Sequence, residues 1–534
     1  MDTNCLFNDE DMQRFIVEGF VTLRSELPNQ FHTRMFNALE TLDEGGPHGH
    51  NNLLPCVPEL RVMLDEPVIV GALTSILGPD YYLHFHRHDH VNFPDSEQPL
   101  HKDGDNHSHY AVDGLRRNQV TRYAMLFYYP QDTPIAAGPT GVVPRTQYIL
   151  RRRVEALRRE HQNHIHKIRQ ELKQEFGDGT DDPASRLAMR ELYKAKEQAL
   201  QDEHPELFEA MRAADAPWES EKIPLTGKAG TVSIVHFDMV HGRYSANTSG
   251  QPRHMVKFLF TRNEEPRKPS WSHSGASWQI EPNAPEAPAW EYFWNWHKGT
   301  PAATAEIAAP DAVTNLQSDD DRLALGAAYT LGSQPTGLPI LEETFLSDDV
   351  GLRTMAAYGL ARSGKAAVPM LMRALDQADA SLAVRIIDVL GDIGPRAVSA
   401  ANALATWTNH AEPMVRRYAL EALGLVISHN AEIDQTFLDT LSAGLVDEDA
   451  IARRNATFAI ARLGKRANAS EIVQRVTDNL YHWHHHVRGW SIEALLRFQD
   501  AQAMKSALSY LSSARWDETP KSGDRPPTPT VMRS

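Results

Sequence analysis

A histidine and an aspartate lie two residues apart in the run Leu100-His101-Lys102-Asp103-Gly104. If this run is extended, alternate residues share a face, so His101 and Asp103 present an imidazole and a carboxylate side by side. His241 follows an apolar run far downstream and would add a second imidazole. Two histidines and one carboxylate form a three-ligand set that holds ferrous iron and leaves coordination positions open. These residues predict a metal site at His101, Asp103 and His241.

A cation is expected beside this site. Arg253 begins the run that returns after the turn at residues 243–252, and a hairpin would bring it back towards His241. A guanidinium there can bind a carboxylate in bidentate fashion, so Arg253 is predicted to bind a dicarboxylate cosubstrate. The next candidates for this cation are Arg122 and Lys257. The competing interpretation is a chance motif, because the chain has 25 histidines and a second His-x-Asp at His236-Phe237-Asp238.

Short apolar runs separated by turn residues would position these side chains. Asn8 to Asp11 predicts a capped helix that leads into a strand. The strand-like runs lie at 19–23, 81–93, 122–129, 231–237 and 255–262. Several such strands between Gly, Pro and Asn turns predict an all-β barrel or jelly roll.

Histidines alternate along the second of these runs, at His84, His86, His88 and His90. A period of two predicts a strand with one histidine-lined face. That face could line a substrate pocket or hold an additional metal. The interpretation we favour is structural: a polar, hydrogen-bonded sheet face without a metal.

Residues 150–216 interrupt the β pattern with two helical stripes, and Asp182 and Pro183 are placed to begin the second helix. They predict a helical hairpin inserted between two strands, with a solvated charged surface. A lid or an oligomer contact is the alternative, since long insertions are often functional. The connecting segment 266–318 is rich in proline and tryptophan. Its tryptophans are expected to pack between domains rather than to form a ligand cage.

From residue 319 to 514 the chain becomes rich in alanine and leucine and repeats itself. An arginine is followed seven residues later by an aliphatic residue at 353–360, 416–423, 453–460 and 488–495, and 384–391 fills the gap. Such a period predicts an α-solenoid whose units look like short HEAT repeats. Because solenoid stability comes from neighbouring repeats, a fragment from near residue 320 is expected to fold alone. Residues 515–534 have the composition of a disordered tail.

Bulk composition limits the function classes. The chain has 534 residues, too many for one core, and a formal net charge of −16 that disfavours nucleic acid and anionic membranes as partners. Two cysteines, Cys5 and Cys56, provide no disulfide framework or cysteine zinc site and favour a cytoplasmic location. The N-terminus does not resemble a secretory signal, and no apolar run is long enough to span a membrane.

Several of these motifs resemble one family. Residues 8–262 look like the phytanoyl-CoA dioxygenase family of Fe(II)/2-oxoglutarate oxygenases. The His-x-Asp pair at 101–103 matches the family's ligand pair, and residues 15–23 resemble its N-terminal helix and strand. The run 137–147 is similar to its "NGp…viPGSH" turn, although Arg145, Thr146 and Gln147 replace Gly-Ser-His. The motif "Gd…f…HG…N…R" is matched by Gly230-Thr231, His241-Gly242, Asn247 and Arg253.

The resemblance implies a double-stranded β-helix in residues 1–265. It also implies that His101, Asp103 and His241 bind iron and that Arg253 clamps the distal carboxylate of 2-oxoglutarate. The expected activity is an Fe(II)- and 2-oxoglutarate-dependent dioxygenase, most simply a hydroxylase of a small organic molecule. The solenoid is expected to dock a protein partner or the substrate. The alternatives are a non-catalytic scaffold on a retired oxygenase domain, and an oxygenase acting on a protein- or carrier-bound substrate.

Overall fold

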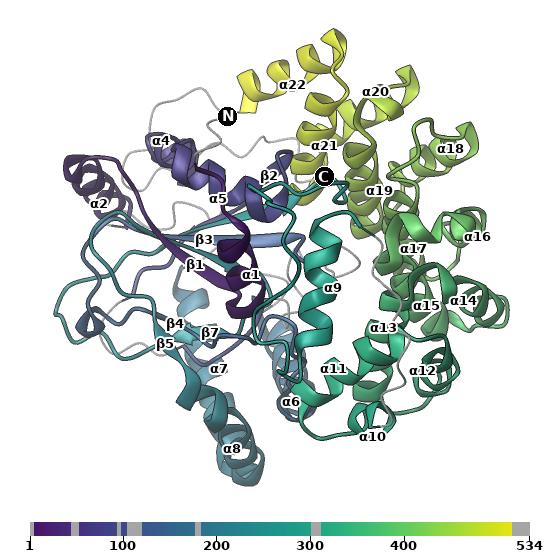
Figure 1. Cartoon of the computed structure of the whole chain (residues 1–534). Coiled ribbons are helices and arrows are strands. Elements are labelled where there is room, and N and C mark those ends of the chain that lie inside the picture. Colours follow the sequence, from purple (N-terminus) through teal and green to yellow (C-terminus); the bar gives the residue numbers. More distant parts are fainter. Residues whose placement is uncertain are drawn as a thin grey trace. The chain divides into compact units, whose positions relative to one another are not determined.

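The computed structural model describes residues 5–43, 53–92, 98–103, 120–176, 183–300 and 311–514 (Figure 1). The chain divides into two compact units. One consists of Ile149–Ile223, and the other combines Met1–Tyr148 with Pro224–Ser534. The predictions for Gly104, for the turn around Asp182 and for the tail 515–534 lie outside the described residues.

The N-terminal helix α1 (Asp9–Glu18) begins and ends as its sequence predicts. The Asn8 side chain accepts a hydrogen bond from the Asp11 backbone, and Asp11 accepts one from Asn8 in return, which closes a capping box. Gly19 ends the helix at a φ of 80°, where a side chain would be strained, and β1 (Phe20–Arg24) follows. The next helices are α2 (Asn29–Asp43), α3 (Leu53–Cys56), α4 (Leu60–Leu64) and α5 (Pro67–Leu77).

The strands of the described residues form two sheets. The first has the order β1-β6-β3-β8-β2, with antiparallel pairing throughout. Its further strands are β2 (Tyr81–Asp89), β3 (Tyr123–Tyr129), β6 (Thr231–His236) and β8 (Val256–Arg262). The second sheet has the order β5-β4-β7, built from β4 (Thr140–Val142), β5 (Ile223–Pro224) and β7 (His241–Arg243). Each predicted strand run therefore contains a strand.

One apolar core joins the two sheets. Met125, Phe127 and Tyr129 alternate along β3, which places them on one face. They pack in one buried cluster with Val142 of β4 and with Leu225, which directly follows β5. Two sheets that share one core are the coarse arrangement that the predicted all-β barrel or jelly roll requires. The assignment of this domain as a double-stranded β-helix stays a prediction.

The histidines along the β2 run do not line one continuous face of the sheet. The register between β2 and β8 shifts between Leu83 and Arg87, which divides the strand. On one side of the shift, the His84 ring lies 5.5 Å from that of His486 in α21 (His485–Arg497). On the other side, the His88 and His90 rings lie 4.6 Å apart. Part of the predicted histidine face is thus covered by the C-terminal helices.

The described residues of the inserted unit form three helices rather than the two of the predicted hairpin. They are α6 (Arg152–Phe176), α7 (Pro183–Glu203) and α8 (Pro205–Glu221). The predicted stripe of Ile165, Ile168 and Leu172 packs with Leu200 in the core of this unit. The third helix escapes sequence reasoning because Pro217 lies in its interior, where proline normally interrupts a helix.

The tryptophan-rich segment forms a helix, α9 (Ala287–His297), that packs against α1 and against α11 (Asp321–Gly332). Trp290 and Trp294 of α9 are each 1% exposed. This agrees with the interpretation that the tryptophans are packing residues between the β domain and the helices that follow.

The C-terminal half is helical, and each long helix packs on the next long helix along the chain (Figure 1). The long helices after α11 are α13 (Val350–Ser363), α15 (Ala380–Ile393), α17 (Pro413–Val426) and α19 (Ala450–Leu463), followed by α21. Shorter helices alternate with them: α10 (Ala312–Leu316), α12 (Leu338–Phe345), α14 (Val368–Leu375), α16 (Ala401–Trp407), α18 (Gln435–Gly444) and α20 (Ser470–Asp478), with α22 (Ala501–Ala514) last.

The arginines that mark four of the repeats share a structural role. Arg416 donates to the carbonyl of His410, and Arg488 donates to that of His482, in each case six residues earlier. Arg453 and Arg353 donate to Asp447 and Ser347 at the same offset. The repeated arginine therefore ties the start of a long helix to the turn before it. The assignment of these units as HEAT repeats stays a prediction.

The β domain and these helices share a buried ion cluster. Glu265 follows β8 and is 4% exposed. Its carboxylate accepts two hydrogen bonds from Arg122 beside β3, at 3.0 and 3.1 Å, and one from Arg462 of α19 at 3.2 Å. A buried ion pair, between Glu265 and Arg462, therefore connects the two sides of the predicted boundary near residue 319. Both sides belong to one compact unit.

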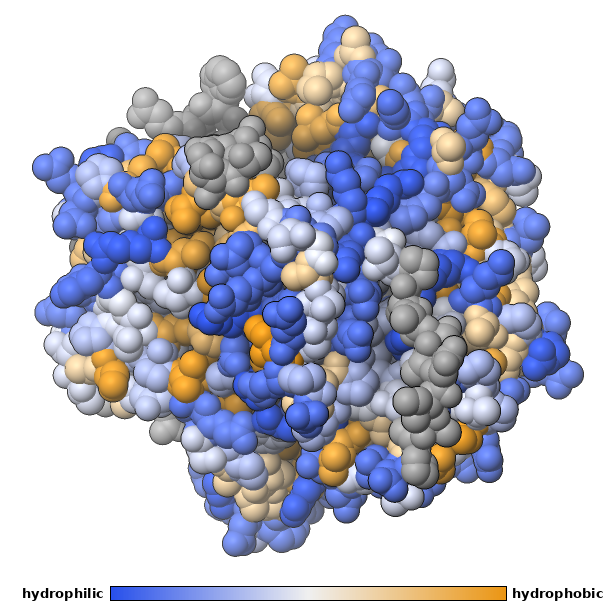
Figure 2. All heavy atoms as spheres, viewed as in Figure 1, coloured by the Kyte–Doolittle hydropathy of each residue, from blue (hydrophilic) through white to orange (hydrophobic). Residues whose placement is uncertain are grey.

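Hydrophilic residues predominate on the face shown in Figure 2, and an apolar patch lies over α22. Leu508 and Leu511 of that helix are 58% and 50% exposed. Within the described ranges, none of the helices combines the length and the apolar character that crossing a bilayer requires.

Candidate metal centre

His101 and His241 face each other across two antiparallel segments. The His101 backbone N–H donates to the His241 carbonyl at 2.8 Å, and the His241 N–H donates back at 2.9 Å. Residues that exchange both backbone hydrogen bonds lie directly opposite, with side chains on the same face. Accordingly, the two imidazole rings are 4.4 Å apart.

Gly242 allows this close approach. A Cβ atom at this position would lie 2.9 Å from the Pro99 carbonyl oxygen and 3.0 Å from that of Gln98. These are backbone atoms, so a side chain would push the 98–101 segment away from β7. The His-Gly pair is thus explained by packing: the glycine lets the segment that carries His101 lie against the strand that carries His241.

Asp103 completes the cluster. Its Oδ1 lies 3.9 Å from Nε2 of His101, and its Oδ2 lies 4.0 Å from Nε2 of His241. One ligand atom from each of these residues lies within 4.8 Å of the others, a spacing that could hold one metal ion. The three residues predicted from their spacing are therefore brought together.

Both imidazoles are oriented by the backbone. Nδ1 of His101 lies 3.0 Å from the Pro99 carbonyl, and Nδ1 of His241 lies 3.0 Å from the Met239 carbonyl. A carbonyl can only accept, so each Nδ1 carries the proton. In the neutral ring the lone pair is then on Nε2, which faces Asp103. Burial lowers the pKa of His241 to about 3, so this imidazole is neutral at physiological pH, as a ligand must be.

Arg253 is a buried cation that forms no ion pair with the described residues. Its residue is 5% exposed, and its Nη atoms donate to the carbonyls of His90 and Gly138 at 3.3 and 2.9 Å. Among the described residues, no carboxylate forms an ion pair with this guanidinium, and its Nε has no hydrogen-bond partner. Burial lowers the pKa of Arg253. An uncompensated buried guanidinium is costly, which favours an anionic ligand at this position.

Strand β3 links the histidine cluster to Arg253. The ring of Phe127 lies 6.0 Å from the ring of His241, and the Arg253 guanidinium lies 5.9 Å from the ring of Tyr129. Phe127 and Tyr129 are two residues apart on the same face, a separation of about 7 Å along a strand. A short dicarboxylate is of this size, so the spacing suits a ligand that reaches from the cluster to Arg253.

Sequence reasoning named Lys257 as a reserve cation for the cosubstrate and missed its direct contact with the cluster. Its side chain is 3% exposed, and its ammonium pairs with Oδ2 of Asp103. Although burial opposes the charge of Asp103, this ammonium holds the pKa of the carboxyl well below its usual range. One signal was present: Lys257 alternates with Met255 and Leu259, which are buried in the core of the β domain.

Other candidate residues have structural partners. Arg122, a second possible cation for the cosubstrate, is held by Glu265. The alternative His-x-Asp is not part of the cluster: the His236 ring packs 5.3 Å from that of Tyr148, and His236 accepts from the Asp238 backbone. Arg145 adopts a φ of 66°, a conformation that explains why glycine is expected at this position in the turn motif.

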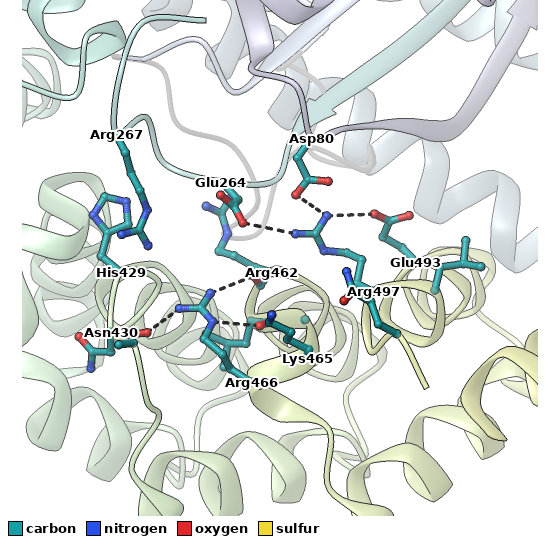
Figure 3. Close-up of a pocket in the computed structure, with 15 residues that line it drawn as sticks. Asp80, Glu264, Arg267, His429, Asn430, Arg462, Lys465, Arg466, Glu493 and Arg497 are labelled. Atoms are coloured by element: carbon teal, nitrogen blue, oxygen red, sulfur yellow. Dashed lines mark hydrogen bonds and ion pairs between the residues drawn. The ribbon is translucent and has the colours of Figure 1, made fainter. Parts of the chain in front are cut away.

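A separate cavity of about 680 Å³ lies where the β domain meets the ends of α19 and α21 (Figure 3). Its charges compensate one another. Arg497 pairs with Asp80 at 2.5 Å and with Glu493 at 3.7 Å, and Arg466 donates to the carbonyls of Ser428 and Asn430. The cavity is therefore explained as a polar part of the contact between the β domain and the C-terminal helices.

No family model matches the sequence, and no curated protein matches it. Among solved structures, the chain is similar to the non-heme α-ketoglutarate-dependent carbocyclase SnoK from nogalamycin biosynthesis, at 17% identity and a TM-score of 0.30, covering 48% of this chain and 85% of SnoK. It is also similar to EctD from S. alaskensis with 2-oxoglutarate and 5-hydroxyectoine, at 14% identity and a TM-score of 0.30, covering 50% and 80%. The non-heme monooxygenase ThoJ in its nickel complex has 14% identity and a TM-score of 0.29, covering 60% and 94%.

Likenesses at these TM-scores carry no argument about function. The resemblance to the phytanoyl-CoA dioxygenase family likewise stays a prediction. The case for chemistry rests on the residues of the centre itself.

Proposed function

We propose that this chain is an Fe(II)- and 2-oxoglutarate-dependent oxygenase with His101, Asp103 and His241 as the metal ligands. The observation that carries the proposal is the convergence of two imidazoles and one carboxylate within 4.8 Å. Their donor set fits ferrous iron, because two neutral imidazoles and one carboxylate leave further positions open. Bound iron with 2-oxoglutarate would supply the activation of dioxygen.

The residues around the centre have distinct tasks in this proposal. The carbonyls of Pro99 and Met239 orient the two imidazoles. Arg253 would bind the distal carboxylate of 2-oxoglutarate, because it is buried and lacks an acidic partner among the described residues. Tyr129 packs beside its guanidinium and excludes water from that ion pair. We propose a small organic molecule as substrate and hydroxylation as the reaction.

Metal binding is the first test. His101→Ala and His241→Ala should remove binding of Mn²⁺ or Fe²⁺, measured by calorimetry, while the far-UV circular dichroism spectrum is retained. His236→Ala is the matched control, since this histidine belongs to the second His-x-Asp and should leave affinity unchanged. Full metal binding in the His101 and His241 variants, with loss in the His236 variant, would refute the ligand assignment.

Arg253 provides the second test. Loss of a buried charge partner costs about 2–5 kcal/mol, which is roughly 30-fold to several-thousand-fold in affinity. Arg253→Ala should therefore raise the 2-oxoglutarate concentration needed for oxygen consumption by that factor, with Mn²⁺ affinity nearly unchanged. The 2-oxoglutarate requirement of Arg253→Lys should lie between those of the unaltered chain and Arg253→Ala, because lysine keeps the positive charge and loses the bidentate geometry of the guanidinium. An unchanged requirement would assign the cosubstrate to another cation.

We further propose that the C-terminal helices dock a protein partner or a carrier-bound substrate. The apolar side chains that α22 exposes, Leu508 and Leu511, support this role. Oxygen consumption by the full chain with free small molecules would separate this case from small-molecule chemistry. Leu508→Ser with Leu511→Ser should lower turnover of a docked substrate and leave turnover of a free one unchanged.

A further inference from the structure

Lys257 lies on the inward face of the β domain. Its strand, β8, pairs with two others, so that Lys257 is opposite Phe127 of β3 and His88 of β2. The side chain is 3% exposed, so its ammonium has no access to bulk water. Within the described part of the chain, its ion pair is with Asp103. A buried lysine is normally compensated by a carboxylate, and here that carboxylate is the one predicted to bind metal.

The ammonium and a metal would compete for the carboxylate of Asp103. Oδ2 of Asp103 accepts from Lys257 and also lies 4.0 Å from Nε2 of His241. A protonated lysine has no lone pair to offer a metal, and at a few ångströms it repels a divalent cation. The ion that fills the space between the two histidines must therefore share Asp103 with the ammonium or displace it.

We infer that Lys257 is a built-in counter-cation that holds Asp103 in the metal-free protein and must yield before metal binds tightly. The inference rests on the proposed function, since it requires metal at the His101, Asp103 and His241 cluster. It has two consequences. Lys257 weakens metal affinity, and an anionic ligand that pairs with the released ammonium restores it. A dicarboxylate such as 2-oxoglutarate has the charge for both Lys257 and Arg253.

The test compares metal affinity in full-length variants. Lys257→Met removes the charge and keeps the length of the side chain. Lys228→Met is the matched control, because Lys228 is 73% exposed and pairs with Asp132 at 2.8 Å on the surface. Each protein is stripped with a chelator and titrated with Co²⁺, followed by its visible absorption. A hydrogen bond to a charged group is worth about 1.5–3 kcal/mol, so Lys257→Met should bind Co²⁺ roughly 10- to 100-fold more tightly.

Two further readouts come from the same proteins. The metal-free Lys257→Met variant should melt at a lower temperature than the unaltered chain, because Asp103 loses its partner, and Co²⁺ should raise its melting temperature more. Adding 2-oxoglutarate should tighten Co²⁺ binding more in the unaltered chain than in Lys257→Met. Lys257→Gln replaces the methionine variant if circular dichroism shows that the latter is unfolded.

The outcomes separate the two proposals. Equal Co²⁺ affinity in the unaltered chain and Lys257→Met overturns the competition and leaves the metal site intact. Weaker binding in Lys257→Met also overturns it and makes Lys257 a residue that positions Asp103. If neither protein binds Co²⁺, the metal assignment itself fails, and the inference fails with it.

Discussion

Replacement of Glu265 by glutamine tests whether the β domain and the C-terminal helices fold as one body. The carboxylate is 4% exposed and receives three hydrogen bonds from two guanidiniums, those of Arg122 and Arg462. Glutamine keeps the shape of the side chain and removes its charge. Two buried arginines would then face each other without a shared anion.

The magnitude follows from the pKa of Glu265. Burial opposes its charge, yet Arg122 and Arg462 outweigh burial and lower the pKa from 4.5 to about 2. At 1.36 kcal/mol per pKa unit, this corresponds to about 3 kcal/mol of stability. Because the folded pKa is depressed, this contribution is present above about pH 4.5 and is lost as the pH falls towards 2. Breaking a buried ion pair by removing one partner costs about 3–5 kcal/mol, which agrees.

Urea unfolding at pH 7, followed by circular dichroism, measures this effect. Glu265→Gln should lower the free energy of unfolding by about 3–5 kcal/mol. Glu264→Gln is the matched control, because the neighbouring carboxylate is 55% exposed and lies 3.9 Å from Arg497. Its loss should cost less than about 1 kcal/mol. The reasoning would be refuted if the two variants unfolded at the same urea concentration.

Three further predictions concern the centre and its support. Gly242→Ala should weaken Mn²⁺ binding with retained circular dichroism, because its Cβ would displace the segment that carries His101; unchanged affinity would contradict this packing argument. His254 donates to Asp89 and Glu40, and although burial opposes its charge, these bonds raise its pKa from 6.5 to about 9. Its contribution of about 3 kcal/mol should be complete below pH 6.5 and lost as the pH rises through about 9, so a His254→Gln variant should show a flatter stability profile over that range. The isolated fragment 319–514 stays predicted to fold as helices, but it should melt below the full chain, since it lacks Glu265; a higher melting temperature would contradict the coupling.

Much of the centre could be predicted from the sequence alone. His101 and Asp103 are local neighbours, and His241 follows a predicted strand, so spacing and the family resemblance together named the three residues that the fold brings together. The ion pair between Lys257 and Asp103 could not be predicted in this way, because it depends on how β8 pairs with its neighbours, and such long-range register is not visible in a local pattern. The same limit explains why Arg122 was a reasonable candidate: its partner Glu265 lies far along the chain.

In the C-terminal half, too, local features could be predicted from the sequence and long-range contacts could not. The repeated arginine was recognised because it recurs at a helical-repeat period, and each repeat satisfies its own turn. The domain boundary was placed by composition, which reports what each segment contains and not what it contacts. Contacts between Glu265 and Arg462, or between the His84 and His486 rings, require the three-dimensional fold.

The order of strands in the five-stranded sheet has a consequence for biosynthesis. No two neighbours in β1-β6-β3-β8-β2 are consecutive in the chain, so β1, β2 and β3 leave the ribosome before any of their partners exists. The partners β6 and β8 are made after the inserted unit Ile149–Ile223, whose helices contact one another locally. Because non-local pairing is slow, the early strands keep unpaired edges until β6 and β8 are made, and unpaired edges are prone to aggregation. The insert can acquire its helices first, and the five-stranded sheet closes once β8 is complete.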